Sequence, residues 1–114
     1  MSLAVSGTNL FAGTYGGGVF LSTNNGGNWT GVNTGLTNSI VRSLAVSGTN
    51  LFAGTWGGVF LSTNSGGSWT KVSTGLTYTY VQSLAVLGTN FFAATDGGVS
   101  ERRNNHHPDK KCKR

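Results

Sequence analysis

The sequence predicts an all-β protein built from repeats, and three observations carry that prediction. Short runs rich in Val, Thr, Leu, Phe and other aromatics alternate with glycine-containing stretches, and the 114 residues include 19 Gly but 1 Pro. No window places apolar residues at the spacing of an amphipathic helix. The motif Ser-Leu-Ala-Val occurs at 2–5, 43–46 and 83–86, which indicates a repeat of about 40 residues.

Each repeat should contain four short strands, and the second copy shows them most clearly. Its expected strands are 42–46, 51–55, 59–62 and about 69–73. Turns of two to four residues join antiparallel neighbours, so each copy should form a four-stranded meander. The first copy has one additional glycine after Tyr15 compared with the stretch after Trp56, and such an insertion belongs in a turn.

Both faces of the expected strands carry apolar side chains, so each sheet should be covered on both sides. Strict alternation would divide the first strand of copy two into Arg42, Leu44 and Val46 on one face and Val41, Ser43 and Ala45 on the other. The small residues at 43 and 45 would let a neighbouring sheet approach closely. Sheets of this size stack in a β-propeller, whereas a β-trefoil also repeats four strands over a similar length.

An eight-residue stretch at 22–29 returns at 62–69 with the shared pattern Ser-x-Asn-x-Gly-x-x-Trp. This pattern resembles the Asp-box, or bacterial neuraminidase repeat, of propellers in sialidases, xyloglucan-degrading hydrolases, sortilin-type receptors and a photosystem II assembly factor. The resemblance spans residues 2 to about 100 and implies a propeller rather than a trefoil. It also implies a structural role for the matched residues, which are Ser22, Asn24, Gly26, Trp29, Ser62, Asn64, Gly66 and Trp69. Asn24 and Asn64 stand where the family usually has Asp.

The third copy loses the pattern after Val99, so about two and a half repeats are expected. The predicted divisions are blade 1 at 2–40, blade 2 at 41–80, a partial blade 3 at 81–100 and an irregular basic tail at 101–114. Such an incomplete propeller cannot close a ring and would leave apolar faces and strand edges open. We therefore expect a homo-oligomer, or further blades in a longer chain.

Charge and composition narrow the function classes. Residues 1–100 carry a net charge of +1, from Arg42 and Lys71 against Asp96, which gives no reason to expect nucleic-acid binding. No apolar run reaches the length of a membrane span, and the first residues already belong to a repeat, so no signal peptide is expected. The compartment stays open between the cytoplasm and, for a piece of a longer chain, the cell surface or exterior. The lone Cys112 excludes an internal disulfide, and His106 and His107 fit no zinc pattern, so no metal or cofactor is expected.

Catalysis is not expected. A sialidase-like site would need an arginine cluster, a Tyr with a Glu partner and an acidic proton donor. The repeats contain only Arg42, no Glu, and Asp96 without an acidic companion. We therefore predict no catalytic residues and a non-catalytic structural or binding scaffold. The alternative is a fragment of a sialidase- or xyloglucanase-like hydrolase.

Differences between the nearly identical copies gather at one end of the meander, opposite the repeated box. The turn after the second strand carries Tyr15, Trp56 and Asp96 in successive copies, and the link into the third copy carries Tyr78 and Tyr80. Exposed aromatic residues suit sugar faces or protein partners, so these five residues are the predicted ligand-binding set. Neutral drift at exposed turns explains the same differences equally well.

Overall fold

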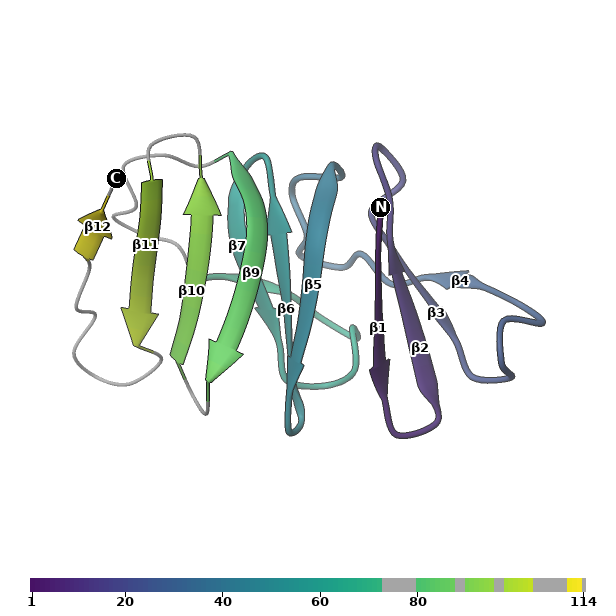
Figure 1. Cartoon of the computed structure of the whole chain (residues 1–114). Helices are drawn as coiled ribbons and strands as arrows, with labels where there is room; N and C mark the ends of the chain where they lie inside the picture. Colours follow the sequence, from purple (N-terminus) through teal and green to yellow (C-terminus); the bar gives the residue numbers. More distant parts are fainter. Residues whose placement is uncertain (73–79, 88–89, 96–97, 104–110, 114) are drawn as a thin grey trace.

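A computed structural model describes residues 1–72, 80–87, 90–95, 98–103 and 111–113 of the chain. Within these residues all regular secondary structure is β-strand, arranged in three four-stranded antiparallel sheets that lie side by side in chain order (Figure 1). No helix long and apolar enough to span a membrane occurs in the described part. The predicted all-β class with four-stranded antiparallel sheets is confirmed.

Each sheet is a meander whose strands follow one another in sequence. Blade 1 contains β1 (Ser2–Ser6), β2 (Asn9–Gly13), β3 (Val19–Ser22) and β4 (Thr30–Gly31). Blade 2 contains β5 (Val41–Ser47), β6 (Asn50–Thr55), β7 (Gly58–Ser62) and β8 (Thr70–Lys71). Blade 3 contains β9 (Val81–Leu87), β10 (Asn90–Thr95), β11 (Gly98–Arg103) and β12 (Lys111–Lys113).

The strand limits differ from the expectation in two places. The fourth strand of blade 2 is the two-residue β8 rather than 69–73, because Trp69 turns out of the sheet into blade 1. Blade 3 does not end at residue 100, since β11 and β12 continue its ladder into the segment expected to be an irregular tail. Ladder hydrogen bonds use main-chain groups, so the pairing persists where the side-chain pattern of the repeat has stopped.

A β-bulge in β5 changes which residues share a face. The register between β5 and β6 shifts between Val41 and Ser43, and this shift interrupts the alternation. As a result Val41 lies with Leu44 in the core between blades 1 and 2, so placing Val41 with Ser43 and Ala45 was wrong. Arg42 lies at this shift and is not part of the core that contains Val41 and Leu44.

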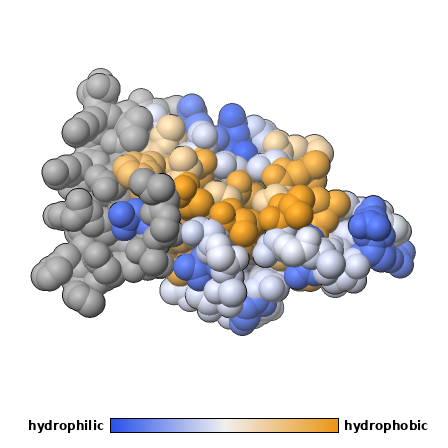
Figure 2. Space-filling model, turned by 60° about the horizontal axis from the view of Figure 1, so that its bottom comes forward, coloured by the Kyte–Doolittle hydropathy of each residue, from blue (hydrophilic) through white to orange (hydrophobic). Residues whose placement is uncertain are grey.

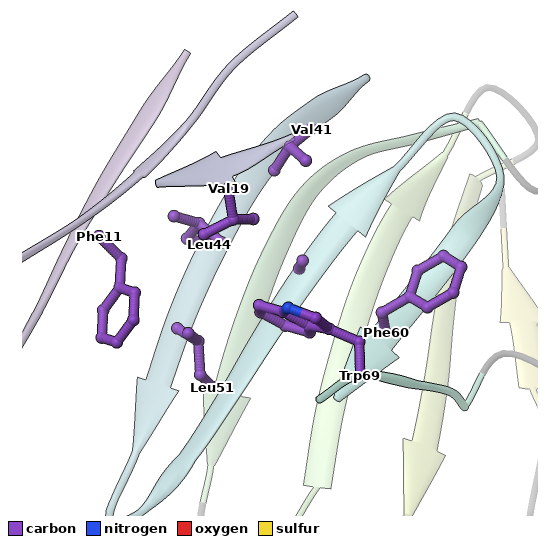
Figure 3. Close-up of a cluster of buried hydrophobic side chains, with 8 residues drawn as sticks. Phe11, Val19, Val41, Leu44, Leu51, Phe60 and Trp69 are labelled. Carbon is purple, nitrogen blue, oxygen red and sulfur yellow. The ribbon is translucent and has the colours of Figure 1, made fainter. Parts of the chain in front are cut away.

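The core lies between the sheets, in two layers of the same design. For each blade we call the face toward the preceding blade its front and the face toward the next blade its back. The back of blade 1 and the front of blade 2 enclose buried residues, seven of which are labelled in Figure 3: Phe11, Val19, Val41, Leu44, Leu51, Phe60 and Trp69. The second layer, between blades 2 and 3, buries Phe52, Val59, Val81, Phe91 and Ala93.

Glycine allows the blades to approach closely at one repeated position. A Cβ atom on Gly13 would lie 2.6 Å from Cγ1 of Val41, and one on Gly54 would lie 2.7 Å from Cγ1 of Val81. Both distances are shorter than Cβ contacts allow, so the valine of each following blade occupies the space that a side chain would take.

Serine hydroxyls connect the innermost strands of successive blades. The amide of Leu44 in β5 donates to Oγ of Ser2 in β1 at 3.0 Å. The amide of Leu84 in β9 donates to Oγ of Ser43 in β5 at 3.1 Å. Small residues at these positions were expected to permit close approach, and the serines also accept a hydrogen bond from the next blade.

Candidate functional site

The candidate site is one end of the blades, where the β2–β3 and β6–β7 turns meet the links between blades. We call Tyr15, Arg42, Trp56 and Tyr80 at this end the aromatic rim. Tyr15 follows β2, and Trp56 follows β6 at the equivalent position of blade 2. Tyr80 directly precedes β9, and Arg42 lies at the bulge of β5.

The backbone of the link at Ile40 holds both turns of the rim. Ile40 forms an antiparallel bridge with Tyr15, and its carbonyl accepts the amide of Trp56 at 3.2 Å. The carbonyl of the adjacent Ser39 accepts the amides of Gly16 and Gly18, at 2.9 and 3.0 Å. The aromatic residues therefore stand on turns whose main chain is bonded to a neighbouring segment.

Trp56 and Tyr80 form a stacked pair across blades 2 and 3. Their ring centroids are 5.2 Å apart, and their planes differ by 10°. Trp56 is half-buried, whereas Tyr80 is 53% exposed. The Tyr80 ring is therefore exposed to solvent and packs against the less exposed ring of Trp56.

Tyr15 and Arg42 form a second contact, across blades 1 and 2. The guanidinium carbon of Arg42 lies 5.3 Å from the centre of the Tyr15 ring, within the range of a cation–π contact. Tyr15 itself is largely exposed. Arg42 was not among the predicted binding residues. The position of Arg42 depends on the bulge in β5. The only sign of it in the sequence is that Arg42 lies at the start of this strand, two residues after Ile40.

Two predicted site residues, Tyr78 and Asp96, lie outside the residues that the structure describes. The structure brings together Trp56 with Tyr80 and places Tyr15 beside Arg42. The rim therefore offers aromatic faces, one guanidinium and the amide of Asn38, whose side chain lies against Gly57. Among the described residues, no three His, Cys, Asp or Glu side chains gather as a metal site would require.

The repeated box stretches at 22–29 and 62–69 form the turns between the third and fourth strands, at the opposite end of the blades. Ser22 is buried, and its hydroxyl accepts the amide of Gly26 at 2.7 Å and donates to Oδ1 of Asn24 at 3.0 Å. The same Oδ1 accepts the amide of Asn28 at 2.9 Å. The second stretch repeats this network through Ser62, Asn64, Gly66 and Ser68. The polar side chains of the box thus bond to their own turn.

The two box tryptophans differ in their surroundings. Trp69 is 5% exposed, its indole nitrogen donates to the carbonyl of Val32 in blade 1 at 2.7 Å, and its amide donates to the carbonyl of Thr34. Trp29 occupies the same position in blade 1 and is 41% exposed. The difference follows from the neighbours, because blade 2 has blade 1 in front of it.

No protein-family model and no curated protein matches this sequence. Among solved structures, it is similar to the computationally designed Ika8 protein, with a TM-score of 0.71 and 18% identity, over 90% of this chain and 32% of that one. It is also similar to the computationally designed Ika4 protein, with a TM-score of 0.70 and 18% identity, over 90% of this chain and 64% of that one. The chain thus spans about a third of one and just under two thirds of the other. Both neighbours are propeller-like, and at this identity the likeness shows the fold: an all-β, β-propeller-like arrangement of repeated blades.

Proposed function

We propose that this protein is a non-catalytic binding module of the β-propeller type, and that its aromatic rim binds a glycan. The observation that carries the proposal is the stack of Trp56 on Tyr80, which leaves Tyr80 half-exposed on a rigid base. Sugars combine apolar C–H faces with hydroxyl edges. An exposed aromatic ring suits the first, and amide or guanidinium donors suit the second.

The surroundings of the stack support a polar ligand. Asn38 lies against the turn that carries Trp56, and Arg42 lies over Tyr15 on the adjoining blade. The contact of Arg42 with Tyr15 spans the junction of blades 1 and 2, and the stack of Trp56 with Tyr80 spans the junction of blades 2 and 3, so an aromatic contact lies at each of two neighbouring junctions. Two aromatic platforms along one edge fit an extended ligand better than a single isolated ring does.

We also infer that the box stretches are Asp-box turns in which Asn takes the place of Asp. The amide oxygens of Asn24 and Asn64 each accept a hydrogen bond from a serine hydroxyl and from a backbone amide of the turn. A carboxylate could accept the same bonds. Because these contacts lie within the turn itself, we assign the box a structural role. It lies at the end of the blade opposite the rim.

A glycan array followed by calorimetry tests the proposed function. Removal of both rings in Trp56→Ala/Tyr80→Ala should weaken binding of the selected glycan at least tenfold, which corresponds to about 1.4 kcal/mol. The matched variant Trp56→Phe/Tyr80→Phe keeps both rings and should retain most of the affinity.

Circular dichroism of both variants establishes that the fold is intact. If the array selects no glycan, or if the alanine variant binds as well as the parent chain, the glycan proposal is wrong. A protein partner captured by the same rings would assign the rim to protein recognition instead.

A further inference from the structure

The front face of blade 1 is an uncovered copy of a face that blade 2 buries. Leu3 is 65% exposed, whereas its counterpart Leu44 is 8% exposed in the core between blades. Trp29 and Trp69 differ in the same direction. The remaining positions agree: Leu10, Ala12 and Phe20 are half-buried, and their counterparts Leu51, Ala53 and Phe60 are buried. Figure 2 shows hydrophobic surface across the middle of the visible face, with hydrophilic residues at the end opposite the grey atoms.

On the back face of blade 3, residues of β9 are more exposed than their counterparts on the back of blade 2. Ser83 and Ala85 on β9 are exposed, whereas their counterparts Ser43 and Ala45 on β5 are half-buried beneath blade 3. Phe92 on β10 is half-buried and points away from the core residues Phe91 and Ala93, because neighbouring residues of a strand face opposite sides. It stands where Phe11 and Phe52 form the backs of blades 1 and 2.

We propose that the front of blade 1 is a docking surface for the back of blade 3 in a second copy of this chain. The chain itself contains this pairing of front and back twice, at the junctions of blades 1 and 2 and of blades 2 and 3. A second copy supplies the face that the repeat is built to meet. Burial of the exposed Leu, Val and Trp side chains drives the association.

The polar contacts of the internal junctions define the orientation. Each junction has a serine hydroxyl on the back face that accepts a leucine amide from the front face of the next blade. Between copies, the same bond joins the amide of Leu3 to Oγ of the exposed Ser83. Two front faces pressed together would offer no such serine to Leu3, so the internal pattern favours head-to-tail association.

One position of the docking face differs from the internal copies. Ala94 stands where blades 1 and 2 have Gly13 and Gly54. A Cβ atom at Gly13 would lie 3.4 Å from Cδ1 of Leu44, and one at Gly54 would lie 3.2 Å from Cδ1 of Leu84, so the leucine must shift by up to a few tenths of an ångström; Leu44 and Leu84 are the counterparts of Leu3. The shorter contacts of both glycines are to Val41 and Val81, whose position lies before β1 in blade 1. The methyl group of Ala94 therefore meets the side chain of Leu3 when the copies dock.

Blocking each face separately tests the proposal. Analytical ultracentrifugation of the 114-residue chain should show species larger than the 11.8 kDa monomer. Leu3→Arg blocks the front, Phe92→Arg blocks the back, and each variant alone should sediment as a monomer. In a mixture, the intact back of Leu3→Arg can bind the intact front of Phe92→Arg. The two variants should therefore form a one-to-one dimer, and the blocked faces prevent further association. Thr49→Arg, in the exposed turn between β5 and β6, is the control for an added charge and should associate like the parent chain.

Several results would overturn the proposal. They are a parent chain that stays monomeric, association that survives Leu3→Arg, and self-dimerisation of Phe92→Arg, which would indicate pairing of two fronts. If a variant does not fold, acrylamide quenching of tryptophan fluorescence in the parent chain tests whether this face becomes covered. The accessible tryptophan fraction, to which Trp29 contributes, must fall as the concentration rises through the association range, and an unchanged fraction contradicts docking on this face.

Discussion

At the scale of single residues, the box turns hold two residues other than glycine in a left-handed backbone conformation. Asn25 has a φ of 61°, and Ser65 has a φ of 58°. Asparagine enters this region several times more readily than serine, because its short amide can hydrogen-bond locally. Both residues are exposed, so packing does not distinguish them.

We predict that Ser65→Asn stabilises the protein by about 0.5 kcal/mol, because it lowers the conformational cost of this turn. Urea unfolding followed by circular dichroism measures the change. Asn25→Ser is the matched reverse substitution and should lower the free energy of unfolding by a similar amount. Equal stability of all three proteins would show that the left-handed position carries no cost here.

At the scale of the element, the box turn of blade 2 is also a connection between blades. Trp69 leaves the turn, enters the core beside Phe11 and Val19, and donates its indole hydrogen to the carbonyl of Val32. The turn thus combines its own internal hydrogen bonds with a contact to the preceding sheet.

Trp69→Phe should therefore destabilise the fold by about 2 kcal/mol, because it leaves a cavity in the core and removes the indole donor from the partly buried carbonyl of Val32. Trp29→Phe changes the same position of blade 1 and should cost less than about 0.5 kcal/mol in the monomer, since that ring is half in water. Denaturant titrations at concentrations where the chain is monomeric compare the two. Similar losses for both variants would contradict the different roles of the two tryptophans.

The sequence was sufficient to predict the four-stranded meander, since the repeats, turn lengths and alternation all depend on local residues. It was insufficient for the bulge beside Arg42, because a one-residue shift in pairing depends on the partner strand. It was also insufficient to distinguish Trp29 from Trp69, since their sequence contexts are almost the same and only the neighbouring blade differs. Rim residues could be selected by comparing copies, whereas the stacking of Trp56 on Tyr80 required the link between blades to be placed in space.

At the scale of the whole molecule, the blades are unequally covered. Five of the six residues of β6 in blade 2 are buried, whereas β1 of blade 1 alternates between half-buried and exposed residues. In a stack of repeats each blade is stabilised by its own interactions and by those with its immediate neighbours, so the middle blade gains two such contributions.

Native-state hydrogen exchange should therefore find the slowest amides in β6 and β7 and markedly faster exchange in β1, when the chain is measured as a monomer. The variant Leu3→Arg provides a monomer for this experiment if the parent chain associates. Uniform protection across blades 1 and 2 would indicate that the molecule opens as one unit rather than from its uncovered end.

The serine–leucine bonds between innermost strands have a geometric consequence. Apolar contacts alone would let two stacked sheets slide along the strand direction, whereas the bonds from Leu44 to Ser2 and from Leu84 to Ser43 fix that displacement at each junction. The same hydrogen bond thus recurs at equivalent residues of both junctions. Repetition of one movement from blade to blade produces a closed ring when it is a pure rotation and a helical filament when it includes a translation. Any larger assembly that repeats this junction therefore carries the same restraint on sliding between its sheets.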